Sequence, residues 1–219
     1  MKQMVKELLF RVTILLVGLV IAHLGVTLFL LADLGADPFN VFVQGVFRTL
    51  CTLFSHPLLT HGNTHVCISL IIIIILLAVD RAYVKIGTLL CMILGGPIID
   101  GFTFLLSPLL AALPFLWIKI VMLTAGCFIL AFGMSIVIKS EAGTGPNDLV
   151  AVVISDRIRK KFSVIRMIVD FSFVLVGFFL GGSFGVGTVI CTFLIGPAAG
   201  FFLPRIENVI SNIMKKKAL

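Results

Sequence analysis

Long runs of apolar residues dominate this sequence and limit it to folds that a lipid bilayer can accommodate. A helix needs about 20 apolar residues to cross a bilayer. The runs of about this length fall at residues 8–31, 64–79, 86–110, 117–138, 163–182 and 186–204. Only 12% of the 219 residues are charged, whereas a soluble domain carries about a quarter. The composition therefore excludes a soluble enzyme and predicts one all-helical membrane domain, residues 1–219, with six transmembrane helices.

Basic residues lie at the chain ends and between the apolar runs. The formal net charge of +7 would suggest nucleic-acid binding in a soluble protein. Because Lys and Arg accumulate on the cytoplasmic side of membrane proteins, we interpret the charge as an orientation signal and expect no nucleic-acid partner. Six spans with both termini cytoplasmic leave only Arg48 and Lys119 outside. An eight-span alternative divides the basic residues almost as unevenly, so charge alone does not decide between the two.

Two shorter apolar segments follow Pro38 and Pro146. Only seven uncharged residues separate Asp148 from Asp156, which is about 11 Å of helix at 1.5 Å per residue. That length cannot cross a hydrocarbon core about 30 Å thick. We therefore expect two short re-entrant or half-helices beside the six spans.

The second half of the chain repeats the first. An offset of 108 aligns Gly18, Gly25, Gly35 and Pro38 with Gly126, Gly133, Gly143 and Pro146, and an offset of 100 aligns Gly87, Thr88, Gly96 and Pro97 with Gly187, Thr188, Gly196 and Pro197. We expect one repeat at about residues 8–110 and a second at about 117–204, each with three spans. Because three is odd, the second repeat enters the membrane from the opposite side. Such inverted repeats with interrupted helices are typical of transporters.

A matching polar loop, acid-x-Gly-x-x-Pro followed by Asn or Asp, precedes each predicted half-helix. These loops supply most of the predicted substrate-binding residues: Asp33, Gly35, Asp37, Pro38 and Asn40 in the first, and Glu141, Gly143, Gly145, Pro146, Asn147 and Asp148 in the second. Pro suits a first helical turn, and Asp37 is a good N-cap. Free N–H groups at a helix start favour anions, whereas the acids favour cations, so the sign of the ligand's charge stays open. The alternative is two ordinary polar turns at the membrane surface.

Four residues within the spans complete the predicted substrate-binding set: Thr88, Thr188, Arg166 and Asp170. Arg166 and Asp170 are four residues apart on the fifth span, so they share a helix face and can pair. An ionisable residue within a span is costly and marks a functional site by default. Alternatively, Arg166 extends to the membrane interface. For the two threonines we favour hydroxyls that bond to their own helices.

Extra residues in the first repeat contain His56, His61 and His65. Imidazoles are metal ligands, but this spacing matches no established metal motif, so we favour an exposed polar loop and expect no metal and no cofactor. The five cysteines are scattered and predict no disulfide framework. No Walker, HExxH or GxSxG motif is present, so we expect no catalytic residues and no enzyme activity.

The two polar loops, the Gly-Thr pairs with their Gly-Pro partners, and Arg166 followed by an acid resemble the bacterial YczE-like membrane proteins within the YczE/YyaS/YitT grouping. The resemblance covers residues 11–204. It implies a multi-pass protein of the bacterial inner membrane and names no substrate.

These features together favour a small secondary transporter or channel-like permease. We expect it to move a small polar or charged molecule or ion through a site between the two loops. The alternative is a substrate-binding subunit or an accessory or regulatory protein of a larger membrane complex. Besides the lipid bilayer and the solute, we therefore expect a second copy of the chain or another subunit as a partner.

Overall fold

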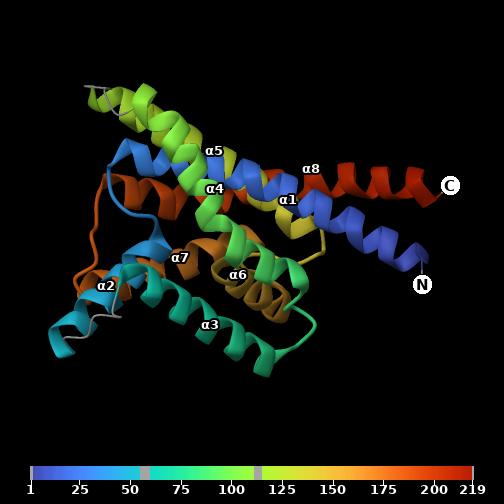
Figure 1. Cartoon of the computed structure of the whole chain (residues 1–219), viewed down its shortest axis with the longest axis horizontal. Helices are drawn as coiled ribbons and strands as arrows, with labels where there is room; N and C mark the ends of the chain where they lie inside the picture. Colours follow the sequence, from blue (N-terminus) through green and yellow to red (C-terminus); the bar gives the residue numbers. More distant parts are fainter. Residues whose placement is uncertain (1, 55–59, 111–114, 219) are drawn as a thin grey trace.

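The computed structural model describes residues 2–54, 60–110 and 115–218, and these residues form helices joined by loops, with no strand among them (Figure 1). The helices are α1 (Lys2–Ala32), α2 (Pro38–Leu53), α3 (His61–Val79), α4 (Ile86–Leu110), α5 (Leu116–Lys139), α6 (Pro146–Ile158), α7 (Phe162–Phe179) and α8 (Val186–Ala218). All except α2 and α6 are long and apolar enough to cross a membrane. The predicted all-helical fold with six spans is thus confirmed.

The two remaining helices begin at the predicted prolines. α2 has 16 residues and α6 has 13, so they measure about 24 and 20 Å at 1.5 Å per residue and fall short of a bilayer core. Asp37 caps α2 by accepting a hydrogen bond from the backbone N–H of Asn40 at 3.2 Å. From the middle of the molecule α2 runs toward one end, and α6 lies toward the other end (Figure 1).

Matched glycines bring α1 and α5 into close contact. A Cβ on Gly18 would lie 2.9 Å from the carbonyl oxygen of Gly133, and a Cβ on Gly25 would lie 2.5 Å from that of Gly126. Small residues let membrane helices approach this closely. The earlier glycine of α1 contacts the later one of α5, so the two helices run antiparallel. This pairing fits the inverted topology, which stays a prediction.

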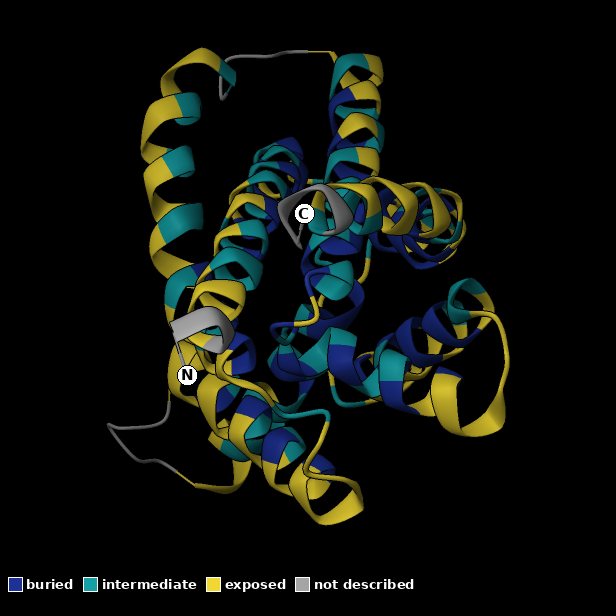
Figure 2. Ribbon diagram, turned by 90° about the vertical axis from the view of Figure 1, so that its right-hand side faces the viewer, coloured by how far each residue is buried: buried dark blue, intermediate teal, exposed yellow. Residues whose placement is uncertain are grey.

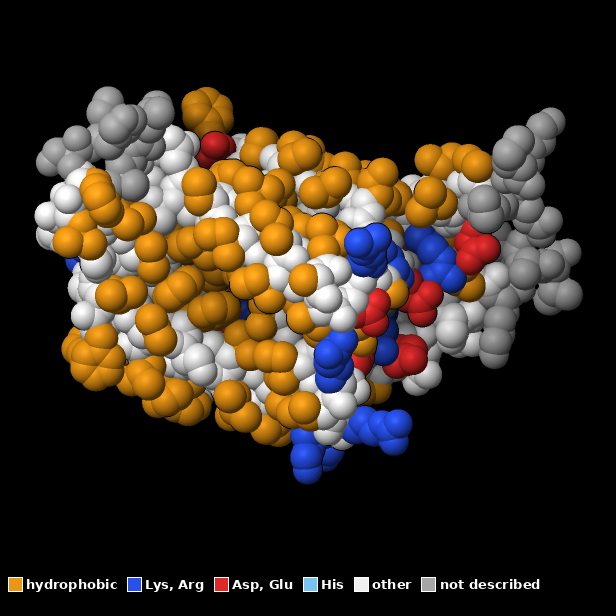
Figure 3. Space-filling model, turned by 90° about the horizontal axis from the view of Figure 1, so that it is seen from below, with side chains coloured by type: hydrophobic (Ala, Val, Ile, Leu, Met, Phe, Trp, Pro, Cys, Tyr) orange, Lys and Arg blue, Asp and Glu red, His pale blue; other side chains and the backbone are white. Residues whose placement is uncertain are grey.

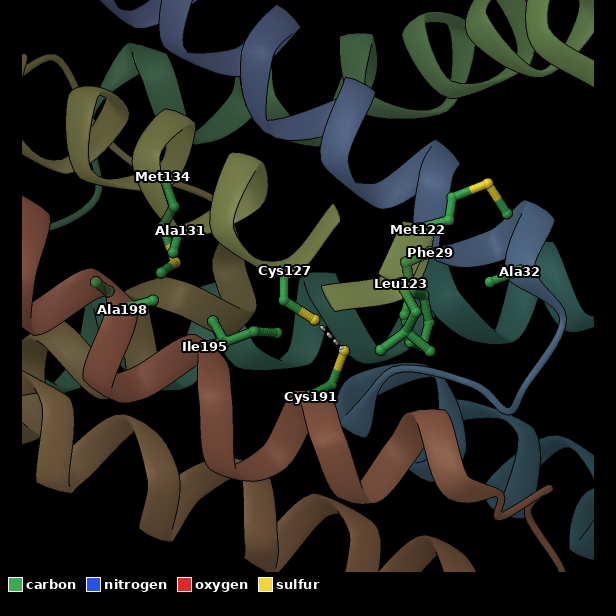
Figure 4. Close-up of a cluster of buried hydrophobic side chains, with 11 residues drawn as sticks. Phe29, Ala32, Met122, Leu123, Cys127, Ala131, Met134, Cys191, Ile195 and Ala198 are labelled. Carbon is green, nitrogen blue, oxygen red and sulfur yellow. Dashed lines mark hydrogen bonds between the residues drawn. The ribbon is translucent and has the colours of Figure 1, made fainter. Parts of the chain in front are cut away.

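A buried apolar cluster joins α1, α5 and α8 (Figure 4). Within it the free thiols of Cys127 and Cys191 lie 3.1 Å apart. The cluster also contains Phe29, Leu123, Met134 and Ile195. Because the two cysteines are 64 residues apart, the spacing of cysteines in the sequence gave no sign of this contact.

Apolar side chains cover most of the face shown in Figure 3, whereas Lys, Arg, Asp and Glu gather toward the end that carries both termini. The outward faces of the helices are exposed in the isolated chain (Figure 2), and several of the exposed residues are large and apolar, such as Phe104 and Ile74. An apolar surface of this extent marks a membrane contact. With its six candidate spans, the chain is a multi-pass membrane protein.

The last helix is longer than the apolar run predicted. α8 continues through Pro197 and Pro204 to Ala218, whereas the sequence predicted a span that ends at residue 204. Since helices in membrane proteins tolerate proline when neighbouring groups satisfy the freed carbonyls, Pro204 does not end the helix.

Candidate functional site

A buried group of charged side chains lies where the start of α6 meets α7. Arg166 on α7 donates from Nε to Asp170 Oδ2 at 2.9 Å, and from Nη1 to Asp148 Oδ1 in the first turn of α6. Arg166 is 5% exposed and Asp170 is 0% exposed, so the alternative that Arg166 extends to the membrane interface is wrong. Removing one partner of a buried ion pair costs about 3–5 kcal/mol. We call Arg166, Asp148 and Asp170 the charged cluster.

Negative charge exceeds positive charge at the cluster. Asp37, at the start of α2, lies close enough to Asp170 for the two charges to interact, as does Asp148. Two carboxylates thus bind the one guanidinium, and Asp37 adds a third negative charge that acts on Asp170. The positive ends of the two helix dipoles, about half a charge each, offset part of this excess. The region around Arg166 is consequently suited to a cation more than to an anion.

Three buried oxygen atoms lack a hydrogen-bond partner among the described residues: Asp170 Oδ1, Thr88 Oγ1 and Thr144 Oγ1. Buried polar atoms nearly always have partners, and an unsatisfied one costs about 1–3 kcal/mol. An ionised carboxylate oxygen only accepts hydrogen bonds, whereas a hydroxyl donates or accepts. The free acceptor on Asp170 would be satisfied by a ligand that donates. Thr144 was not predicted from the sequence, although it directly follows Gly143 of the second loop.

Each polar loop is tied to the last span of the other repeat. The backbone N–H of Gly87 in α4 donates to the carbonyl oxygen of Ala142 at 2.9 Å, and that of Gly187 in α8 donates to the carbonyl oxygen of Leu34 at 2.8 Å. Gly187 is the equivalent of Gly87 by the offset of 100, and Ala142 is the equivalent of Leu34 by the offset of 108. The two hydrogen bonds are therefore equivalent. The two loops are therefore held in matching ways between the repeats.

The central glycine of each loop is required for its conformation. Gly35 has φ +134° and Gly143 has φ +131°, a region that glycine adopts readily and other residues rarely. A Cβ on Gly35 would also lie 2.8 Å from Thr188 Oγ1, and one on Gly143 would lie 2.6 Å from the backbone nitrogen of Thr88. These two predicted site residues thus shape the loops through their backbones.

The two predicted threonines are fully buried but make different contacts. Thr188 Oγ1 donates to the carbonyl oxygen of Ala36 in the first loop at 2.6 Å. Thr88 Oγ1 has no partner in the described part of the chain. The interpretation that each hydroxyl bonds to its own helix is therefore wrong. Both threonines lie in the first turn, where no helical carbonyl four residues earlier exists.

Asp33 and Glu141 stay at the surface. Both are exposed, with φ +51° and +58°; Asp33 directly follows α1, and Glu141 lies two residues after the end of α5. Glu141 forms an ion pair with Arg11. Of the predicted acids, Asp37 and Asp148 act electrostatically on Asp170.

The remaining predicted residues form the starts of the half-helices. The Asn40 side chain donates to Asp37 Oδ2 at 2.5 Å, whereas Asp148, at the equivalent position, pairs with Arg166. Pro38 and Pro146 are buried first residues of α2 and α6. Gly145 precedes α6 without a side-chain cap, and a Cβ there would lie 3.3 Å from Asn147 Oδ1.

The histidines of the first repeat are not all in a loop. His61 and His65 lie in α3, where His65 makes an edge contact with Phe39 at 5.2 Å between ring centroids, so the loop prediction is wrong for these two. His56 lies outside the described residues. The residues that the structure describes contain no group of three or more His, Cys, Asp or Glu that could hold a metal.

Comparison with known proteins places the chain among helical membrane proteins. Residues 9–204 match a family of unknown function, DUF6198. The uncharacterized membrane protein YczE of Bacillus subtilis is 29% identical over 98% of this chain and 95% of its own length. An uncharacterized protein of Haemophilus influenzae is 29% identical over 92% and 85%, and the protein YyaS of Bacillus subtilis is 24% identical over 88% and 92%. No solved structure matches. The resemblance to YczE-like membrane proteins is confirmed.

Proposed function

This chain belongs to the DUF6198 family of unknown function, and from its geometry we propose that it is a small secondary transporter or permease. The solute would bind where α2 and α6 begin. The observation that carries the proposal is that Asp148, at the start of one half-helix, binds the buried Arg166, and that Asp37, at the start of the other, acts electrostatically on Asp170. Interrupted helices that meet at a buried polar site recur in transporters, and buried ionisable residues mark ion and substrate paths.

We further propose that the solute carries a positive charge and donates hydrogen bonds, as a small amine does. The three carboxylates outnumber the single guanidinium, and Asp170 Oδ1 has no donor among the described residues. Arg166 is already engaged by two acids, so it is less available to an anion. An ammonium group supplies both the charge and the N–H donors.

The proposed location is the bacterial inner membrane, with both termini in the cytoplasm. Both chain ends lie at the same end of the molecule (Figure 1), and Lys and Arg side chains gather there on the face shown in Figure 3. The positive-inside rule supports a cytoplasmic position for that end.

The test is solute flux into liposomes that contain the purified protein, with small amines, inorganic cations and anions as separate solutes. We expect saturable flux or thermal stabilisation by an amine, and a loss of the effect in Asp148→Asn. Asp80→Asn is the matched control, because Asp80 is an exposed acid that follows α3 and its substitution should change nothing. Neither flux nor stabilisation by any solute would overturn the proposal. Binding without flux would favour a substrate-binding subunit that needs a partner.

A further inference from the structure

In the second repeat, α8 packs tightly on α7 through two glycines. A Cβ on Gly196 would lie 2.6 Å from the carbonyl oxygen of Ser163 and 2.8 Å from Met167 Cγ. A Cβ on Gly200 would lie 2.8 Å from Ser163 Cβ. Neither position has room for a larger side chain. By the offset of 100 the equivalent of Gly196 is again a glycine, Gly96, whereas that of Gly200 is Asp100, so only the contact at Gly196 has a glycine counterpart in the first repeat.

The equivalent contact is missing from the first repeat. Gly96 is the repeat equivalent of Gly196, yet a Cβ on Gly96 would have no neighbour within 4 Å among the described residues outside its own helix backbone. α4 packs chiefly on α1, and α3 packs on α2 and α6. In Figure 1, α3 and α4 are joined at one end and diverge toward the other.

The different packing of the pair α3 and α4 and of the pair α7 and α8 does not arise from a wrong alignment of the two repeats. α3 ends at Val79 and α7 at Phe179, while α4 begins at Ile86 and α8 at Val186, so both pairs of helices keep the offset of 100. The loops and their hydrogen bonds to the other repeat also match. Two equivalent helix pairs are therefore present in two different packings, one closed and one open.

We propose that the two packings exchange: in a second conformation α4 closes on α3 through Gly96, and α8 separates from α7 at Gly196. By the offset of 100, the residue of α3 that takes the place of Met167 is Cys67. This inference rests on the proposed transport function, because the exchange would expose the charged cluster to one side of the membrane and then to the other. Packed helix interfaces suit such a switch, since they have discrete alternative arrangements.

Cysteine crosslinking tests the exchange directly. In a chain whose other cysteines are replaced by alanine, native Cys67 is combined with Gly96→Cys, and the protein is treated in liposomes with a thiol crosslinker. We expect the two positions to link. The matched control pairs Cys67 with Gly101→Cys, because the equivalent of Gly101 is Phe201, which is 53% exposed. Peptide mass spectrometry would identify the links. No link to position 96, or equal links to positions 96 and 101, would overturn the proposal.

A bulky residue in place of Gly96 tests the same exchange through its effect on solute flux. Gly96→Leu has room in the present conformation, so we expect the protein to fold with an unchanged melting temperature. It should nevertheless lose flux by about tenfold or more, because the closed α3–α4 contact could no longer form. Gly101→Leu, also in open space, should keep full flux. Unchanged flux in Gly96→Leu would contradict the exchange.

The two proposals fail in different ways. If the wild-type protein carries no flux of any solute but Cys67 still links to position 96, transport is wrong and the exchange of packings stands. If flux is present but the link never forms and Gly96→Leu transports normally, the transport proposal stands and the space beside Gly96 is a fixed surface that faces lipid.

Discussion

Arg166 and Asp170 form a buried ion pair one helical turn apart on α7, with Arg166 Nε 2.9 Å from Asp170 Oδ2. The pair is not isolated within its helix, because Arg166 also binds Asp148 at the start of α6. The guanidinium thus connects the second half-helix to a membrane span. A rigid fork of N–H donors allows arginine, unlike lysine, to hold two carboxylates in fixed positions.

Loss of this guanidinium should destabilise the protein strongly. Arg166→Ala leaves two acids without their partner, and removing one member of a buried pair costs about 3–5 kcal/mol. Thermal unfolding in detergent should show a clearly lower melting temperature. The matched control is Arg205→Ala, because Arg205 is exposed and contacts the Phe201 ring and backbone. Equal melting temperatures for the two variants would contradict a structural role of the pair.

Two substitutions of Asp37 distinguish its role in capping α2 from the effect of its negative charge. Asp37→Ser keeps a side-chain oxygen for the N-cap, so the melting temperature should stay close to that of the wild type, whereas Asp37→Ala should lose about 1 kcal/mol. Both substitutions remove one negative charge near Asp170. We therefore expect both variants to bind an amine more weakly, as measured by thermal stabilisation at increasing amine concentration. Normal binding in Asp37→Ser would remove Asp37 from the proposed site.

A methyl group at the α1–α5 contact should be poorly tolerated. In Gly25→Ala the new Cβ meets the carbonyl oxygen of Gly126 at 2.5 Å, and overpacking of this kind costs about 1–3 kcal/mol. Gly62→Ala, whose new Cβ has no neighbour within 4 Å in the described part of the chain, is the control and should leave stability unchanged or slightly raised. Chemical denaturation of both variants checks the difference. If Gly25→Ala were as stable as Gly62→Ala, the close approach of the two helices would be wrong.

The second loop should depend on its central glycine. Gly143→Ala places a side chain at φ +131° and 2.6 Å from the backbone nitrogen of Thr88, and backbone strain of this kind costs about 1–3 kcal/mol. We expect a lower melting temperature together with weaker solute binding, because the loop leads directly into Asp148. Gly35→Ala should behave in the same way. Different outcomes for the two variants would show that the matching loops carry unequal roles.

Several elements could be predicted because their signals are local. Pro38 and Pro146 sit at the first helical positions that proline favours, and Asp37 is the N-cap that its side chain predicts. Arg166 and Asp170 pair because a spacing of four residues places them on one helix face. Other contacts gave no such signal, since their partners are distant in the chain. Examples are the hydrogen bond from Thr188 to Ala36 and the contact of Cys127 with Cys191.

The sequence alone determined that this protein is a helical membrane protein with six spans and two shorter helices, because hydrophobic length and helix-start residues act within a short stretch of chain. Only the tertiary structure decided which of the predicted acids meet. Asp148 shares Arg166 with Asp170, and Asp37 acts electrostatically on Asp170, whereas Asp33 and Glu141 stay exposed. It also decided that Gly196 packs on α7 while Gly96 faces open space. Equivalent residues can occupy different surroundings because packing depends on how separate helices are placed, and local sequence does not specify that placement.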